Sequence, residues 1–237
     1  NAQRSSDSVS ASSWRSARLF VTDEFAAPPV ILRVDDSVIG TLGNFSASTG
    51  KAKSKKTFNV CAIVAAAMTG GTVLNYSASL PPEKRRILYV DTEQSRFHCK
   101  RVLCRILRLA GLPTDVHPPL LEFLCLRGYA TKERLRKIEE AIYDLDDLGL
   151  VVIDGIRDLA HDINSPGEAT DLITKLMQWT DERRIHIHTV LHLNKGDDNT
   201  RGHLGTELNN KAETVLQITK DDFARDISSV AAMHIRD

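Results

Sequence analysis

The chain has 237 residues, of which 42% are apolar and 26% are charged, and its formal net charge is zero. This length and apolar content are sufficient for one α/β domain with a large buried core. The balanced charge excludes an overall basic field that would attract nucleic acid or a membrane surface. Any binding of a polyanion must therefore depend on a local cluster of charge.

The cysteine pattern and the apolar segments indicate the class of protein. The four cysteines, Cys61, Cys99, Cys104 and Cys125, lie in apolar or helical segments and form no C-x-x-C pair. They predict buried, reduced thiols in a cytoplasmic protein. The longest weakly charged stretch, residues 57–80, is interrupted by glycines and polar residues, so we expect no membrane span. The N-terminus does not resemble a signal peptide.

The N-terminal region is expected to lie apart from the folded domain. Residues 1–16 are rich in serine and small polar residues, which bury too little surface to offset the entropy lost on ordering. We expect a flexible arm over residues 1–27 and one domain over residues 28–237. Two β-branched segments, 30–34 and 38–40, predict a small hairpin packed against the edge of that domain.

From residue 42 onward, strand-like and helix-like segments alternate. This order builds a mostly parallel sheet with helices on both faces. The predicted strands are 44–48, 87–91, 121–126, 150–154, 185–193, 214–219 and 228–236. The predicted helices are 57–68, 94–110, 132–147 and 168–184. Because no helical pattern separates the last two strands, we expect them to form an antiparallel C-terminal extension joined through residues 221–226.

Several residues predict where these helices begin and end. Thr131 and Ser165 are predicted N-caps, and Pro166 suits a first helical position. Gly111 and Gly149 suit the left-handed residue just past a helix end.

A lysine-rich segment between the first predicted strand of the parallel sheet and its helix predicts a phosphate-binding loop. In the pattern G-x-x-x-x-G-K-[ST], backbone N–H groups and a helix N-terminus bind the phosphates, the lysine reaches the β/γ oxygens, and the hydroxyl ligates Mg²⁺. Gly50, Lys56 and Thr57 match this pattern, but Lys55 stands where the second glycine is expected. If that position requires a positive φ, a side chain there costs about 1–2 kcal/mol. The predicted nucleotide contacts are Gly50, Lys51, Ala52, Lys53, Ser54, Lys55, Lys56, Thr57 and Phe58.

The same segment allows two alternatives. The register that takes Gly50 and Lys51 as the Gly-Lys pair places Ala52 where a hydroxyl is required, so it is rejected. The other alternative is a solvated, lysine-rich turn that precedes a helix and binds nothing. It stays open on this segment alone.

An acidic residue at the end of a second apolar strand is predicted to ligate Mg²⁺ together with the Thr57 hydroxyl. Residues 150–153 are apolar and are followed by Asp154. A carboxylate at the C-terminal end of a buried central strand holds Mg²⁺ in P-loop enzymes, because Mg²⁺ is a hard ion that prefers oxygen ligands. The predicted metal ligands are therefore Thr57 and Asp154, with ATP and Mg²⁺ bound together.

A third acid follows the strand 87–91. Ligands of open parallel sheets bind beyond the carboxyl ends of the strands, and Glu93 lies just past such an end. Its carboxylate could polarise the water that attacks the γ-phosphate. Alternatively, Glu93 only favours the first turn of the next helix through the helix dipole.

The loop after the strand 185–193 carries an unusual set of polar residues. His192 stands at the tip of the strand, where it could sense the γ-phosphate, and Lys195, Arg201 and His203 follow. Lys195 or Arg201 could reach a phosphate in its own subunit or in a neighbour. A loop this rich in special residues is more often functional than a plain connection. A solvated loop remains the alternative for each side chain.

The order of these motifs resembles RecA-like ATPases, and most closely the RepA/DnaB-type hexameric helicase ATPases of plasmids and other mobile elements. The segment 150–159, Leu-Val-Val-Ile-Asp-Gly-Ile-Arg-Asp-Leu, resembles the Walker B segment of that family and the loop after it. The segment 192–195, His-Leu-Asn-Lys, followed by Arg201 and Gly202, resembles its H-H-x-S-K…R-G motif. The resemblance extends from about residue 30 to the end. Departures from the family pattern are Lys55, Leu193 and Asn194.

The resemblance implies a RecA-like P-loop fold and a set of roles. Glu93 would be the catalytic carboxylate, Lys56 would neutralise developing charge, His192 would be the sensor, and Arg201 would act as an arginine finger across a subunit interface. A homo-oligomeric ring, hexameric in the family, would place the loops after Asp154 and His192 around single-stranded DNA. Coupling to DNA rests on the resemblance alone, because aromatic content is only 5% and no net charge supports it.

The sequence therefore favours an ATP-hydrolysing, RecA-like motor of the helicase or DNA replication and mobilisation type. The alternative is an accessory nucleotide-binding module without efficient hydrolysis, which Lys55 favours and the retained Lys56, Thr57, Glu93 and Asp154 oppose. A small-molecule kinase is less consistent with the sequence, because neither an arginine-rich lid nor an acceptor pocket is identifiable.

Overall fold

The computed structural model describes residues 13–193, 202–221, 223–224 and 227–235. A sheet of seven strands, in the order β11-β10-β3-β9-β8-β6-β7, forms the centre of the molecule. The chain order is β3 (Phe45–Gly50), β6 (Arg86–Asp91), β7 (Leu121–Cys125), β8 (Leu148–Asp154), β9 (His186–His192), β10 (Thr214–Lys220) and β11 (Ser228–Ile235). The pairings from β10 to β7 are all parallel, and β11 alone is antiparallel to its neighbour. The predicted α/β fold with an antiparallel extension is confirmed.

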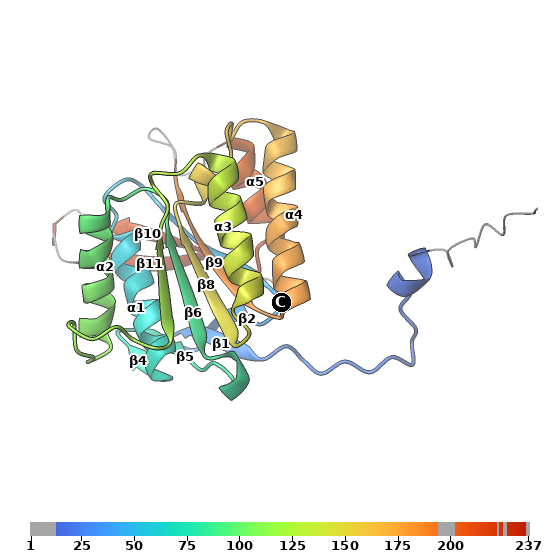
Figure 1. The fold of residues 1–237 in the computed structure, drawn as a ribbon, viewed down its shortest axis with the longest axis horizontal. Helices are drawn as coiled ribbons and strands as arrows, with labels where there is room; N and C mark the ends of the chain where they lie inside the picture. Colours follow the sequence, from blue (N-terminus) through green and yellow to red (C-terminus); the bar gives the residue numbers. More distant parts are fainter. Residues whose placement is uncertain (1–12, 194–201, 222, 225–226, 236–237) are drawn as a thin grey trace, which may run out of the picture.

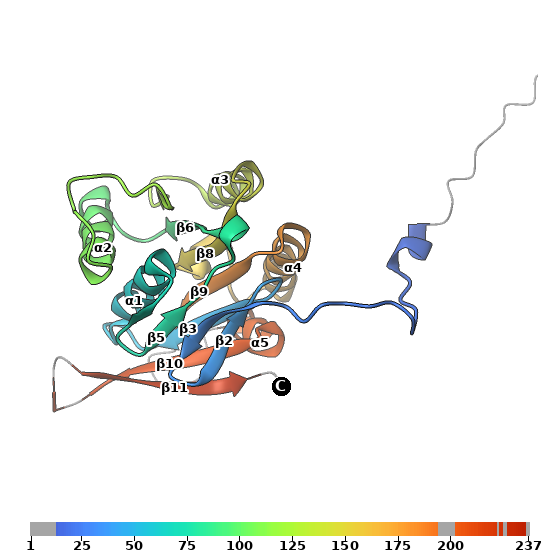
Figure 2. The same cartoon turned by 90° about the horizontal axis from the view of Figure 1, so that it is seen from below.

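Helices cover both faces of this sheet, as Figures 1 and 2 show. On one face, α1 (Lys56–Thr69) and α2 (Arg96–Leu109) pack against buried side chains such as Tyr89 and Val152. On the other face, α3 (Thr131–Asp144), α4 (Pro166–Arg183) and α5 (Gly202–Lys211) pack against Leu88 and Ile153. Alternate residues of β6 and β8 therefore supply two separate cores, as expected for strands buried on both faces. No helix among the described residues is long and apolar enough to cross a membrane.

The predicted N-terminal hairpin is half of a second sheet. Strands β1 (Val30–Val34) and β2 (Ser37–Thr41) form the hairpin, and β1 also pairs with β5 (Tyr76–Ala78), which pairs with β4 (Thr72–Val73). Ile31, Leu32, Tyr76 and Ala78 belong to the same core as α1. The small sheet therefore closes one end of the α1 core. Two short 3₁₀ helices, η1 (Ser13–Ala17) and η2 (Pro82–Lys84), lie before and after it in the chain.

Helix ends agree with the sequence at some positions and differ at others. Ser165 accepts a hydrogen bond from the Glu168 N–H as the N-cap of α4, and Gly111 has φ +68° after α2. The N-cap of α3 is Ala130, so Thr131 is its first helical residue and the prediction for Thr131 was wrong by one position.

The prediction for Gly149 was also wrong. This residue lies inside β8, where a Cβ would approach the Lys84 carbonyl oxygen to 1.9 Å. Close backbone approach, rather than a left-handed turn, is therefore what requires glycine there.

Two further expectations need correction. The loop after β9 was predicted to carry Lys195, Arg201 and His203, but α5 begins at Gly202, so His203 lies in a helix that packs Leu204 and Leu208 into the core. All four cysteines are free thiols, as predicted, but only Cys61 and Cys99 are buried, whereas Cys104 and Cys125 are partly exposed. The predicted arm includes residues 1–12, which lie outside the described residues, and residues 18–30 are exposed.

Candidate active site

The lysine-rich segment forms a tight turn between β3 and α1. Lys53 and Lys55 have φ values of +66° and +69°, so two residues with side chains occupy the left-handed region. The condition left open by the sequence is therefore met at Lys55, and strain of about 1–2 kcal/mol is expected there. Gly50 begins the turn, and a Cβ on it would lie 2.4 Å from the Ile218 carbonyl oxygen of β10. Glycine is therefore required at Gly50 by close packing.

The turn wraps around the side chain of Lys56. Its Nζ donates hydrogen bonds of 2.8 Å to the carbonyl oxygens of both Gly50 and Lys51, and the side chain is 5% exposed. Burial lowers the pKa of Lys56 to about 8, although the charges of Asp154 and Glu93 act in the opposite direction. The loop thus has a concave shape around a cation. Both predicted acids also lie close enough to Lys56 to influence its charge.

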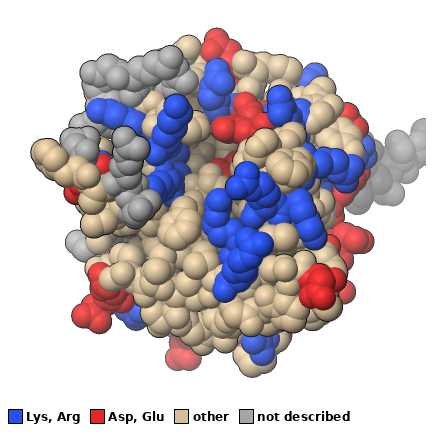
Figure 3. Space-filling model, turned by 90° about the vertical axis from the view of Figure 1, so that its left-hand side faces the viewer, with Lys and Arg blue, Asp and Glu red and all other residues tan. Residues whose placement is uncertain are grey.

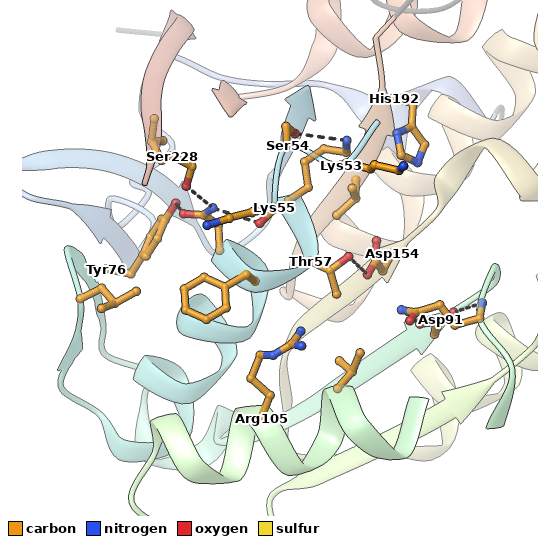
Figure 4. A pocket seen from close by; sticks show the side chains of 18 of the residues that line it. Lys53, Ser54, Lys55, Thr57, Tyr76, Asp91, Arg105, Asp154, His192 and Ser228 are labelled. Carbon is orange, nitrogen blue, oxygen red and sulfur yellow. Dashed lines mark hydrogen bonds between the residues drawn. The ribbon is translucent and has the colours of Figure 1, made fainter. Parts of the chain in front are cut away.

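The first turn of α1 meets the end of β8 at a hydroxyl and a carboxylate. Thr57 Oγ1 donates a 3.0 Å hydrogen bond to Asp154 Oδ2, and the Tyr89 hydroxyl donates a 2.9 Å bond to the same oxygen. Figure 4 shows the side chains of Thr57 and Asp154 pointing toward one another. Burial raises the pKa of Asp154 to about 6, and the two hydrogen bonds oppose that shift. The Asp154 carboxylate is therefore mostly ionised at neutral pH and is held by two hydroxyl groups.

The neighbouring strand end positions Glu93. Asp91 pairs with Asp154 in the β6–β8 register, so the two strands end side by side. Asp91 Oδ1 accepts hydrogen bonds from the N–H groups of Glu93 and Gln94, at 3.0 and 2.7 Å, which fixes the turn after β6. Burial raises the pKa of Asp91.

The turn after β6 also packs directly against the turn after β8. Thr92 Oγ1 donates a 2.8 Å hydrogen bond to the Gly155 carbonyl oxygen. Gly155 has φ +102°, and a Cβ on it would lie 2.3 Å from Thr92 Oγ1 and 2.9 Å from the Glu93 side chain. The absence of a side chain at Gly155 therefore sets the position of Glu93 relative to Asp154.

His192 completes the group from a third strand. His192 pairs with Gly50 in the β3–β9 register, so it lies beside the start of the phosphate-binding turn. Its Nε2 is 3.6 Å from Glu93 Oε1, and this contact lowers the pKa of Glu93. Within the described part of the chain, the buried His192 Nδ1 has no hydrogen-bond partner. Glu93 is therefore an ionised carboxylate in contact with an imidazole.

One cavity of about 1280 Å³ brings these groups together. This volume exceeds the range of roughly 300–1,000 Å³ that is usual for small-molecule sites. Of the predicted site residues, Lys53, Ser54, Lys55, Lys56, Thr57, Phe58, Glu93, Asp154 and His192 line it. Gly50, Lys51 and Ala52 belong to the turn but are not among the lining residues. Lys195 and Arg201 lie outside the described residues, and His203 is exposed in the first turn of α5.

Other residues of the site were not predicted from the sequence. Asp91, Tyr89 and Gln94 support the acids by hydrogen bonds, and only the apolar strand ending in Asp91 gave a local signal for any of them. The far wall of the cavity includes Asn59, Tyr76, Arg105 and Ser228 from four different elements. Asn59 links two of them, because its Nδ2 lies 3.3 Å from Ser228 Oγ and its Oδ1 accepts a 3.1 Å bond from the Tyr76 hydroxyl. Such contacts depend on tertiary structure.

The oxygen groups of Thr57 and Asp154 fit Mg²⁺. Mg²⁺ is typically bound by one or two protein oxygens together with water and phosphate oxygens, and a hydroxyl and a carboxylate 3.0 Å apart provide such a pair. No cluster of three or more His, Cys, Asp or Glu side chains suited to a metal is present among the described residues. A metal here would therefore need oxygens from a bound phosphate, as expected for a nucleotide complex.

Comparisons with known proteins agree with this fold. The sequence matches the model of a family described as "AAA domain" over residues 15–198. The structure is similar to the crystal structure of the RadB recombinase, with a TM-score of 0.56 and 14% sequence identity over 82% of each chain. At this identity the likeness shows a shared fold, which is the RecA-like fold expected from the sequence. The sequence has no significant match among curated proteins.

Proposed function

Because the chain belongs to the AAA domain family, we propose that it binds ATP with Mg²⁺ and hydrolyses it as a RecA-like motor. Family membership and the fold support a nucleotide-hydrolysing motor in general terms. The observation that carries the proposal is the convergence of Lys56, Thr57, Glu93 and Asp154 on one cavity. These four residues come from the start of one helix and the ends of two strands, and they supply a cation, two oxygen ligands and an ionised carboxylate.

Each group has a role that follows from its chemistry. The backbone N–H groups at the start of α1 and the Lys56 ammonium would hold the phosphates. Thr57 and Asp154 would hold Mg²⁺, which neutralises phosphate charge when it is bound. Glu93 would orient the attacking water and accept its proton, because the lowered pKa keeps this carboxylate ionised at neutral pH.

His192 is proposed to link the site to the loop that follows β9. Its Nε2 contacts Glu93, and its unpartnered Nδ1 leaves a donor or acceptor available for a further group. A side chain in contact with the catalytic carboxylate could report the presence of the γ-phosphate to the segment after β9. Arg201, at the end of that segment, is proposed to act as an arginine finger toward a neighbouring subunit.

More specifically, we propose that the protein works as a ring of the RepA/DnaB type. Its support is the sequence resemblance in the segments 150–159 and 192–202. In this form the protein assembles as a homo-oligomer, hexameric by analogy, and translocates on single-stranded DNA in the cytoplasm during replication or mobilisation of a mobile element.

A non-motor nucleotide-binding module is the second candidate. The left-handed conformations of Lys53 and Lys55 favour it, because backbone strain in the turn opposes the close fit that hydrolysis requires. Phosphate release with and without single-stranded DNA distinguishes the two candidates. The motor predicts release that DNA stimulates, whereas the module predicts nucleotide binding with little release under both conditions. If the protein releases phosphate at a rate that single-stranded DNA does not change, it is an ATPase, but the motor proposal is contradicted.

A further inference from the structure

Helix α2 carries an unusual concentration of positive charge. Its fourteen residues include Arg96, Lys100, Arg101, Arg105 and Arg108 but neither Asp nor Glu. Cys99, Val102, Ile106 and Leu107 are buried on the side that packs against the core. The cations therefore occupy the outer side of the helix. Figure 3 looks onto the side of the molecule where α2 lies and shows blue side chains gathered there.

These cations border a groove. A depression of about 470 Å³ is lined by Lys100, Arg101, Cys104, Arg105, Arg108 and Leu109, and we call it the α2 groove. Among the residues that the structure describes, no acidic side chain lines it. Helix α2 also forms one wall of the nucleotide cavity. Arg101 and Arg105 therefore line both the cavity and the groove, whereas Lys100 and Arg108 line only the groove.

The positive charge of the groove is not neutralised within the described structure. No carboxylate of the described residues forms an ion pair with Lys100, Arg101, Arg105 or Arg108. By contrast, α3 pairs Arg136 with Glu140 and Lys137 with Glu133 along its exposed face. Like charges four residues apart, such as Arg101 and Arg105, destabilise a helix. The net charge of the chain is zero, so these unpaired cations are not explained by a general need for solubility. They are better explained by the binding of an anionic partner to this face.

We propose that the α2 groove binds the phosphate backbone of single-stranded DNA. Residues four apart on a helix rise about 6 Å, and Lys100 and Arg108 are separated by about 12 Å along the axis. This places cations at intervals comparable to those of successive phosphates on an extended strand. Phe97, one turn before Arg101, is 69% exposed and offers an aromatic face on which an unpaired base can stack. An exposed aromatic beside a row of cations favours a single strand over a duplex or an acidic protein.

This site is separate from the loops that the sequence resemblance assigns to DNA. Those loops follow β8 and β9, whereas the α2 groove lies on the outer side of a helix that follows β6. A strand in the groove would contact Arg101 and Arg105, which also face the nucleotide cavity. The groove proposal does not require ATP hydrolysis, so the two proposals can fail independently.

The test uses a double charge reversal at the two residues that line only the groove. The Lys100→Glu/Arg108→Glu variant is titrated with a fluorescein-labelled oligothymidylate, and fluorescence anisotropy is measured over a series of salt concentrations. The affinity should fall by about tenfold or more, and the slope of log affinity against log salt should become shallower by roughly 1.4, because about two phosphate contacts are lost. ATP hydrolysis without DNA should be unchanged, since neither residue faces the nucleotide cavity.

A matched control changes the net charge equally at residues outside the groove. Arg33 in β1 and Arg85 after η2 are exposed and line neither the α2 groove nor the nucleotide cavity, so Arg33→Glu/Arg85→Glu should retain oligothymidylate affinity within about twofold. Equal losses in both variants would indicate a general charge effect and overturn the proposal. Unchanged binding by the groove variant would overturn it too. A groove variant that changes the sedimentation coefficient but not DNA affinity would identify the face as a contact between copies, which also contradicts the proposal.

Discussion

The Thr57 hydroxyl donates a 3.0 Å hydrogen bond to the Asp154 carboxylate, although the two residues are 97 positions apart in the sequence. The bond joins the first turn of α1 to the end of β8, and the Tyr89 hydroxyl contacts the same carboxylate oxygen. Two oxygens that would ligate Mg²⁺ are therefore already adjacent. Such preorganisation lowers the entropy that ligand binding must offset.

The first prediction concerns this oxygen pair. Thr57→Ala removes one proposed metal ligand, so Mg²⁺-dependent ATP binding should weaken by about tenfold or more, while Thr57→Ser retains the oxygen and should bind like the native chain. Isothermal titration with a non-hydrolysable ATP analogue at several Mg²⁺ concentrations measures the effect. Equal affinity in the alanine and serine variants would show that the hydroxyl does not ligate a metal.

A second prediction concerns the strained turn. Lys55 has φ +69°, a region that glycine adopts without steric cost. Lys55→Gly should raise the free energy of unfolding by about 0.5–1 kcal/mol, as measured by urea denaturation. Ala52→Gly is the control, because Ala52 has a negative φ in the same turn and the substitution should lower stability by about 0.5–1 kcal/mol. A destabilised Lys55→Gly variant would show that the lysine contacts outweigh the backbone strain.

Gly155 provides a third prediction. A Cβ there would lie 2.3 Å from Thr92 Oγ1, and φ is +102°. Gly155→Ala should therefore cost about 2–4 kcal/mol of stability and displace the turn that carries Glu93, with a loss of ATP hydrolysis. Gly128→Ala is a matched control, because a Cβ at Gly128 meets nothing within 4 Å. If both variants have native thermal stability and hydrolysis, the proposed tight contact between the two turns is wrong.

The alternation of strands and helices and the order of the site motifs were predictable because their signals are local. Four apolar residues ending in Asp154, or a lysine-rich turn before an apolar helix, can be read within ten residues. The motif also marked Lys55 as the position where a positive φ would cause strain, and its φ is +69°. Parallel strands then bring their carboxyl ends together, so the proximity of Glu93, Asp154 and His192 followed from the fold.

The features that the sequence did not predict depend on long-range contacts. Strands β4 and β5 have two and three residues, too few for a periodic pattern. The place of β5 is set by pairing with β1, and that of β4 by pairing with β5. Gly149 was misassigned because the Lys84 carbonyl that excludes a side chain there lies in a distant segment. Helix α5 was missed because the glycines near its start suggested a loop. The role of Asp91 was missed because it acts through backbone N–H groups of the following turn.

The fourth prediction concerns a buried chain of histidines and serines between β3 and β9. His188 bonds to Ser46 Oγ and Ser48 Oγ at 2.8 Å each, and Ser46 also bonds to His186 Nε2 at 2.7 Å. Both histidines are fully buried, and the groups that face them are these serines, the Thr41 carbonyl oxygen and, more distantly, Glu213. Burial lowers the pKa of His188 to about 3.

The sign of the resulting pH dependence follows from that shift. Because His188 is neutral in the folded chain and has a pKa near 6.5 when unfolded, the unfolded state binds more protons below about pH 6.5. Its contribution to stability is therefore complete above about pH 6.5 and declines toward pH 3. His188→Gln should reduce the pH slope of the unfolding free energy between pH 6.5 and 5 by up to about 1.4 kcal/mol per pH unit. An unchanged slope in urea denaturation would show that His188 is protonated in the folded chain.

The most direct test of the central claim compares Glu93→Gln with the native chain in two measurements on the same samples. Phosphate release at saturating ATP and Mg²⁺ should fall by about a hundredfold or more in the variant, because the group that accepts the proton of the attacking water is lost. ATP affinity, measured by titration, should stay within about threefold, since Lys56, Thr57 and Asp154 are retained. Native rates of phosphate release from Glu93→Gln would contradict the assignment of Glu93 as the catalytic carboxylate.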